Sequence, residues 1–150
     1  MNMQTRFNYR QANLQAYQAM LQLEKFVNES GLDKKLIELI KIRASQINGC
    51  AFCMDMHTQD ARKLGETEQR IYLLSVWRES IVYTDAERAV LALTEAVTLI
   101  TKDGVPDALY EQVREHYDEN QYTSLIMAIN TINSWNRIAI STGMFAPYNR

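Results

Sequence analysis

The stretch NGCAFCMDMH, from Asn48 to His57, holds both cysteines of the 150-residue chain and one of its two histidines. If a helix starts at Gly49, the two thiols and the imidazole are separated by steps of three and four residues. Cys50 and Cys53 can then close a disulfide within one turn, and Cys53 and His57 are neighbours at i and i+4. The stretch therefore predicts a chemically reactive helix face.

A nucleophilic thiol in this stretch needs an activating group. Free cysteine has a pKa of about 8.5 and is only a few per cent thiolate at neutral pH. His57 could accept the Cys53 proton directly or through one water. The N-terminus of the helix instead favours thiolate at Cys50, as in thioredoxin-type motifs. The residues alone thus leave open which cysteine is the nucleophile.

A carboxylate upstream extends the pattern. Glu38 precedes Cys50 by twelve positions, in the helix expected before the cysteine pair. The spacing of Glu38, Cys50, Cys53 and His57 resembles the active-site signature of the AhpD-like alkylhydroperoxidases of the carboxymuconolactone decarboxylase superfamily. Segments 45–49, 60–65 and 134–137 are also similar to this family. The resemblance covers about residues 10–145.

The resemblance implies a fold and an activity. The implied fold is all-α, a single-domain orthogonal helical bundle, and the implied activity is that of a thiol-dependent peroxidase or a thiol-disulfide oxidoreductase. In the family's proposed mechanism, Cys53 attacks the peroxide, His57 and Glu38 relay the proton, and Cys50 then closes a disulfide with Cys53. A lipoylated or thioredoxin-like dithiol would reduce that disulfide, with no other cofactor. Homo-oligomers are usual in the family, whereas members that decarboxylate a lactone generally lack the cysteine pair.

Length and charge narrow the class of protein. A chain of 150 residues suits one domain, here 1–150, with residues 1–10 as a possible N-terminal arm. A net charge of −2 and a pI near 5.7 make nucleic acid an unfavourable partner. No signal-peptide pattern and no run of 18 apolar residues is visible. We therefore expect a cytoplasmic protein without a membrane partner, in a compartment where a lone CxxC is catalytic or metal-binding.

Apolar periodicity predicts about seven helices and no strand. Asp33 is a suitable N-cap, Thr84 to Glu87 has the form of a capping box, and Pro106 suits a first helical turn. Gly31, Gly65 and Gly143 mark helix ends. Six of the expected helices span residues 12–28, 33–48, 50–64, 84–100, 106–117 and 120–142. The remaining one begins at residue 67 and carries apolar residues at 71, 74 and 77.

Three alternatives to peroxide chemistry remain. Glu38, Cys50, Cys53 and His57 could in principle hold zinc, but structural zinc sites usually bring a second pair of ligands, and no further cysteine exists. A thioredoxin fold would need a strand before the cysteines. A third alternative is a non-enzymatic redox sensor or scaffold oligomer, whose thiols would switch assembly without turnover.

Single residues also have less specific interpretations. Glu38 falls opposite the apolar side of its helix, together with Lys41 and Ser45, so periodicity alone predicts a solvated glutamate paired with Lys41. Only a packed neighbour, which the resemblance implies, would bury it. His116 has charged neighbours and is interpreted as a surface residue, and Trp135 as a core residue.

The polar residues around Trp135 are unusual in an otherwise apolar helix. Asn133, Asn136 and Arg137 lie within one turn of each other on the last expected helix. We interpret them as groups that either join helices by hydrogen bonds or meet another subunit.

Overall fold

The computed structural model describes residues 4–146, which are all-α and contain no strand, as predicted. The predicted helices correspond to α2–α8, with η1 continuing α5, and α1 is an additional single turn that begins within the predicted arm of residues 1–10. The elements are α1 (Tyr9–Ala12), α2 (Leu14–Glu29), α3 (Lys34–Asn48), α4 (Ala51–Lys63), α5 (Glu68–Leu73), the 3-10 segment η1 (Leu74–Glu79), α6 (Asp85–Thr98), α7 (Asp107–Arg114) and α8 (Glu119–Thr142).

Most predicted helix boundaries are confirmed by their caps. The Asp33 side chain accepts the Leu36 amide, and Thr84 and Glu87 form the reciprocal capping box of α6. The largest difference from the prediction is at the end of α7. α7 ends at Arg114 instead of residue 117, and Arg114 Nε donates to the Tyr117 carbonyl at 3.1 Å across the turn that follows.

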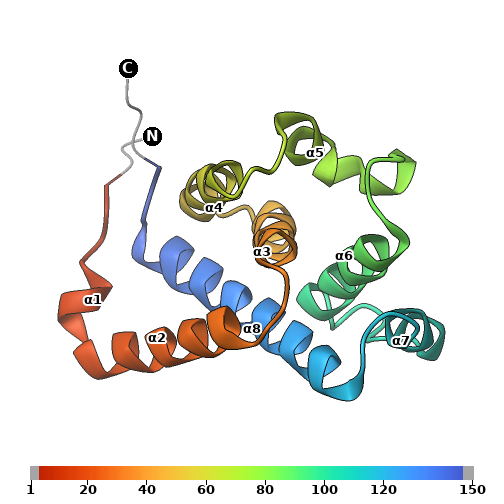
Figure 1. Cartoon of the computed structure of the whole chain (residues 1–150). Helices are drawn as coiled ribbons and strands as arrows, with labels where there is room; N and C mark the ends of the chain where they lie inside the picture. Colours follow the sequence, from red (N-terminus) through yellow and green to blue (C-terminus); the bar gives the residue numbers. More distant parts are fainter. Residues whose placement is uncertain (1–3, 147–150) are drawn as a thin grey trace.

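The helix α3 lies at the centre of the fold. In Figure 1, α2, α4, α6 and α8 surround α3. The view runs almost along the axis of α3, whereas α2 and α8 run across it. One apolar side of α3, including Ile37 and Ile40, packs into the main core with α6 and α8. A second side, formed by Leu39 and Ile42, packs into a smaller core with α4, α5, η1 and α6. The steep crossing of α3 over α8 is the orthogonal arrangement expected.

A third side of α3 is polar and is also buried. Glu38, Lys41 and Ser45 have exposed fractions of 8%, 3% and 0%. Their hydrogen-bonding partners lie on three other helices: His57 of α4, Glu24 of α2 and Asn136 of α8. The predicted alternative of a solvated Glu38–Lys41 pair is therefore wrong. Other helices cover this side, and each polar group is satisfied by one of them.

Buried asparagines join α3 to α8 just before the cysteine pair. Asn48 Nδ2 donates to the side-chain oxygens of Asn133 and Asn136, both at 2.9 Å. Asn133 Nδ2 in turn donates to Thr98 Oγ1 of α6 at 3.0 Å. These contacts confirm for Asn133 and Asn136 that they join helices, and they tie the turn that carries the cysteines to α8. Arg137 instead donates to Asn133 within α8.

The two ends of the described chain lie against each other. The Arg6 amide donates to the Thr142 carbonyl at 2.9 Å, and Arg6 Nη1 donates to the Ser141 carbonyl at 2.9 Å. Gly143 ends α8 with a φ of +74°, and a Cβ there would lie 3.1 Å from the Gln4 carbonyl oxygen. The arm segment from residue 4 onward thus packs on the end of α8, while residues 1–3 lie outside the described part.

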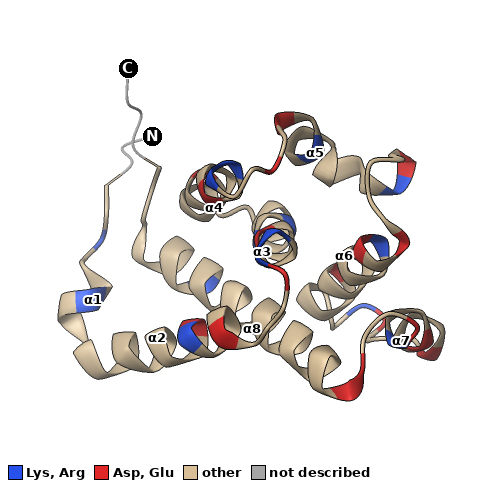
Figure 2. Ribbon diagram, in the orientation of Figure 1, with Lys and Arg blue, Asp and Glu red and all other residues tan. Residues whose placement is uncertain are grey.

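Charge is sparse along α8. Figure 2 shows this helix almost entirely uncharged, since Glu119 and Arg137 are its only charged residues. Its middle is buried against α3 and α6, which accounts for the composition. Within residues 4–146, no helix has both the length and the apolar character needed to cross a membrane.

Replacing Asn136 with alanine should lower the free energy of unfolding by about 1–3 kcal/mol, because Ser45 and Asn48 lose a buried hydrogen-bonding partner. Asn130→Ala, at an exposed position of the same helix, is the matched control and should change stability by no more than about 0.5 kcal/mol. Urea unfolding followed by circular dichroism gives both values. Equal losses in the two variants would show that the asparagine network does not contribute.

Candidate functional site

A tight turn places the two cysteines. Gly49 has a φ of +71° and ends α3, and Cys50 is the N-cap of α4. The helix therefore begins at Ala51, two residues after the start assumed at Gly49. Cys50 Sγ accepts the Cys53 amide at 3.3 Å. The two cysteines form a disulfide, with Cα atoms 5.3 Å apart, and each is only 2% exposed.

The helices α3 and α4 bring a carboxylate to the imidazole. Glu38 Oε2 lies 2.9 Å from His57 Nδ1, and both side chains are buried. An ionised Glu38 accepts a hydrogen bond from Nδ1–H, which leaves the lone pair of the neutral ring on Nε2. This is the contact that the resemblance implied. The structure therefore joins the four predicted residues in two pairs, the disulfide and the Glu38–His57 contact.

A cavity of about 320 Å³ lies over this site, and the side chains of Cys53, His57 and Glu38 line it together. Cys50 is not among its lining residues, so of the two cysteines only Cys53 lines the cavity. The lining residues are Tyr9, Arg10, Tyr17, Leu21, Glu24, Asn28, Glu38, Lys41, Phe52, Cys53, Met56, His57, Asp60, Trp135, Ala139 and Met144.

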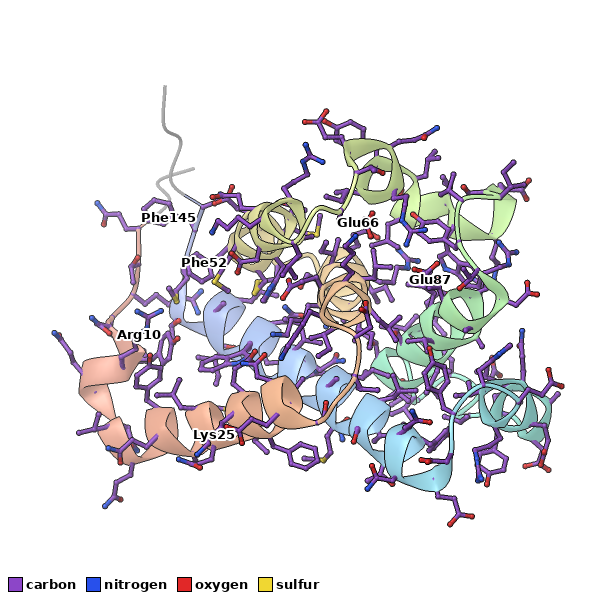
Figure 3. The ribbon with its side chains drawn as sticks, in the orientation of Figure 1. Arg10, Lys25, Phe52, Glu66, Glu87 and Phe145 are labelled. Carbon is purple, nitrogen blue, oxygen red and sulfur yellow. A yellow bond between two sulfur atoms is a disulfide. The ribbon has the colours of Figure 1, made fainter. Side chains whose placement is uncertain are left out.

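Aromatic rings form one wall of the cavity. The rings of Tyr9, Tyr17 and Trp135 have centroids 6.0–6.3 Å apart. Figure 3 shows Arg10 extending from α1 toward the side where Phe52 lies on α4. A hydrogen bond to the Tyr9 hydroxyl at 3.3 Å raises the pKa of the Arg10 guanidinium, although burial lowers it. Trp135, predicted as core, is half-buried and serves both the core and the cavity.

Sequence reasoning missed the role of Lys41 in this cavity. Its ammonium pairs with Glu24 Oε1, and Glu24 Oε2 accepts Trp135 Nε1 at 3.0 Å. The sequence held a signal for this position, since Lys41 lies one turn after Glu38 on the same side of the helix.

The other histidine lies outside the site. His116 is exposed, as predicted.

The zinc alternative has no preformed site in this structure. Both sulfurs that it would need are joined to each other. Across residues 4–146, no group of three or more histidine, cysteine, aspartate or glutamate side chains is arranged to hold a metal.

The chain is similar to proteins of one known family. Residues 11–96 match the model of the carboxymuconolactone decarboxylase family. The uncharacterized protein YdfG of Bacillus subtilis is 53% identical over 141 residues, covering 94% of this chain and 96% of YdfG. Alkyl hydroperoxide reductase AhpD of Streptomyces coelicolor is 38% identical over 69 residues, covering 44% of this chain and 39% of that protein.

A solved structure shares the whole fold. The crystal structure of a protein of unknown function from Agrobacterium tumefaciens, proposed to be the antioxidant defence protein AhpD, has a TM-score of 0.94 to this chain at 47% identity. The match covers 97% of this chain and 100% of that one. The fold is therefore AhpD-like, as the resemblance implied.

After reduction, iodoacetamide should modify Cys53 before Cys50, because only Cys53 lines the cavity and His57 is its neighbour one turn away. Partial alkylation followed by peptide mass spectrometry gives the order. The same labelling in denaturant is the control, and there the two thiols should react at similar rates. Faster labelling of Cys50 in the folded protein would favour the helix N-terminus as the activating group.

Proposed function

Because the chain belongs to the carboxymuconolactone decarboxylase family, we propose that it is a thiol-dependent peroxidase or a closely related thiol-disulfide oxidoreductase. The observation that carries this proposal is the cavity in which Cys53, His57 and Glu38 meet. The partial similarity to an alkyl hydroperoxide reductase supports it. The catalytic roles below are proposals built on these contacts.

The first step uses the reduced form. His57 Nε2 takes the proton of Cys53, and Glu38, at 2.9 Å from Nδ1, orients the ring and stabilises the imidazolium that forms. The Cys53 thiolate attacks one oxygen of the hydroperoxide and breaks the O–O bond. Cys53 becomes a sulfenic acid, and the proton held by His57 passes to the leaving oxygen, which departs as an alcohol or water.

The second step gives the disulfide observed here. Cys50 sulfur attacks the sulfenic sulfur of Cys53, and the hydroxyl leaves as water. The Cα separation of 5.3 Å in the closed pair falls in the range that disulfides ordinarily span. The position of Cys50 at the N-cap of α4 favours its thiolate form for this attack.

An external dithiol would complete the cycle. Since only Cys53 lines the cavity, a reductant would form its mixed disulfide there and release Cys50 first. We propose a lipoylated or thioredoxin-like carrier in the cytoplasm, with no cofactor other than the cysteine pair. The homo-oligomer expected from the resemblance remains a prediction, and exposed Leu14, Leu21 and Phe26 of α2 offer an apolar surface for it.

Cys53→Ser should abolish peroxide-dependent consumption of dithiol, whereas Cys50→Ser should react once and retain a Cys53 sulfenic acid. Dithiol loss and mass spectrometry after dimedone trapping measure the two effects. Trapping at Cys50 in the Cys53→Ser variant would reverse the roles. Oxidation that alters assembly without turnover in the wild type would favour the redox-sensor alternative.

Glu38→Gln should lower the rate of Cys53 oxidation by about 10²-fold or more, because the amide cannot stabilise the imidazolium as a carboxylate does. Glu29→Gln, at an exposed position outside the cavity, is the control and should keep the wild-type rate. Stopped-flow oxidation of the reduced proteins measures both rates. A wild-type rate in Glu38→Gln would remove the proton relay from the mechanism.

A further inference from the structure

Lys41 is a buried cation in the cavity for which the Glu38–His57–Cys53 relay has no role. Its exposed fraction is 3%, and it lines the cavity together with Cys53. Lysine is almost never fully buried unless it is paired, because removing an ammonium from water costs several kcal/mol. Glu24 supplies the pairing partner, and the place of this ammonium in the cavity that Cys53 lines raises the question of a chemical role.

The surroundings of Lys41 fix the ammonium while leaving donors available. An ammonium carries three N–H donors, and among residues 4–146 Glu24 accepts from one side of it. Glu24 is itself held from α8, because its second oxygen accepts Trp135 Nε1 at 3.0 Å. Lys41 Nζ is thus anchored at the cavity wall, with further N–H groups for an acceptor inside the cavity.

The proposed reaction creates such an acceptor. When the thiolate attacks one oxygen of a hydroperoxide, negative charge develops on the other oxygen as the O–O bond breaks. Preorganised donors aimed at developing charge are among the largest contributions to catalysis. Glu38 and Lys41 lie one helical turn apart on α3 and line the same cavity. Glu38 can therefore act on the Cys53 sulfur through His57, while Lys41 acts on the departing oxygen.

We propose that the Lys41 ammonium donates a hydrogen bond to the leaving oxygen of the hydroperoxide, which makes Lys41 a further catalytic residue; this inference rests on the proposed function. In the balanced step, the Cys53 thiol and ROOH give the Cys53 sulfenic acid and ROH. Sulfur is oxidised and the O–O bond is reduced. The proton that leaves Cys53 through His57 ends on the oxygen that Lys41 stabilises, and Lys41 stays protonated.

Two other roles for Lys41 make different predictions. A purely structural ion pair between α2 and α3 would affect stability and leave the chemistry unchanged. A cation that stabilises the Cys53 thiolate would affect every electrophile equally. A donor to the leaving oxygen affects electrophiles in proportion to the basicity of the group that leaves.

The test compares three reagents on the reduced protein. tert-Butyl hydroperoxide expels a strongly basic alkoxide, peracetic acid expels the weakly basic acetate, and iodoacetamide expels iodide. In Lys41→Met, the oxidation of Cys53 by tert-butyl hydroperoxide should slow by about 10²–10³-fold, as for the loss of one oxyanion donor. The oxidation of Cys53 by peracetic acid should slow by less than about tenfold. The alkylation of Cys53 by iodoacetamide should keep its wild-type rate.

Companion variants keep the result interpretable. Lys41→Met combined with Glu24→Gln leaves no unpaired buried charge and should show the same reagent dependence if the single variant folds poorly. Lys41→Arg retains a cationic donor and should recover most of the lost rate. Lys35→Met, at an exposed position of the same helix, should behave as the wild type with all three reagents.

Several results would overturn the proposal. Equal slowing with all three reagents would assign Lys41 to the thiolate or to the fold, and wild-type rates throughout would assign it to the α2–α3 ion pair alone. Failure of the wild type to oxidise any dithiol with peroxide would instead remove the proposed function itself. The wild-type control thus separates the two failures.

Discussion

The structure depends on the burial of the middle of α3, from Leu36 to Ser45, where the buried polar side chains must each find a partner. An unpaired buried carboxylate or ammonium would cost several kcal/mol. The fold meets this requirement because Glu38, Lys41 and Ser45 each find a partner on a different helix, which is α4, α2 and α8 in turn. The same contacts that satisfy the buried groups also assemble the candidate site. Stability and chemistry therefore rest on one stripe of side chains.

Much of the fold could be predicted from local patterns. Helix ends were well marked, because Asp33, the Thr84–Glu87 box and Gly143 act through neighbouring backbone groups. The additional turn α1 was not predicted, since its four residues carry no apolar period and none of them is buried. The turn begins at the N-cap Asn8, and the Tyr9 ring lies 6.3 Å from the ring of Trp135 in α8.

The candidate site was predictable only in part. The spacing of Cys50, Cys53 and His57 follows from helix geometry within α4. The contact between Glu38 and His57 depends on how α3 packs on α4, and periodicity alone predicted a solvated glutamate. The cavity wall of Tyr9, Tyr17 and Trp135 joins the consecutive helices α1 and α2 to α8, which is distant in sequence. No local sequence pattern predicts this contact between helices. For the same reason, Lys41 was predicted to be a solvated partner of Glu38.

The cysteine pair combines two activating influences on different atoms. In the proposed mechanism, the N-terminus of α4 acts on Cys50, and the imidazole one turn further along acts on Cys53. Access separates them, because the cavity reaches Cys53 alone. This division suits a cycle in which one sulfur meets small molecules and the other acts only within the protein.

The contact between Arg6 and the end of α8 has a consequence for how the protein tolerates change. Arg6 leads directly into α1, whose Tyr9 and Arg10 form part of the cavity wall. The wall of the cavity thus depends on the segment around Arg6 and on the end of α8, which are both far in sequence from the cysteines. Bulky fusions near residue 4, or a side chain in place of Gly143, would reshape substrate entry while leaving every thiol and proton donor intact.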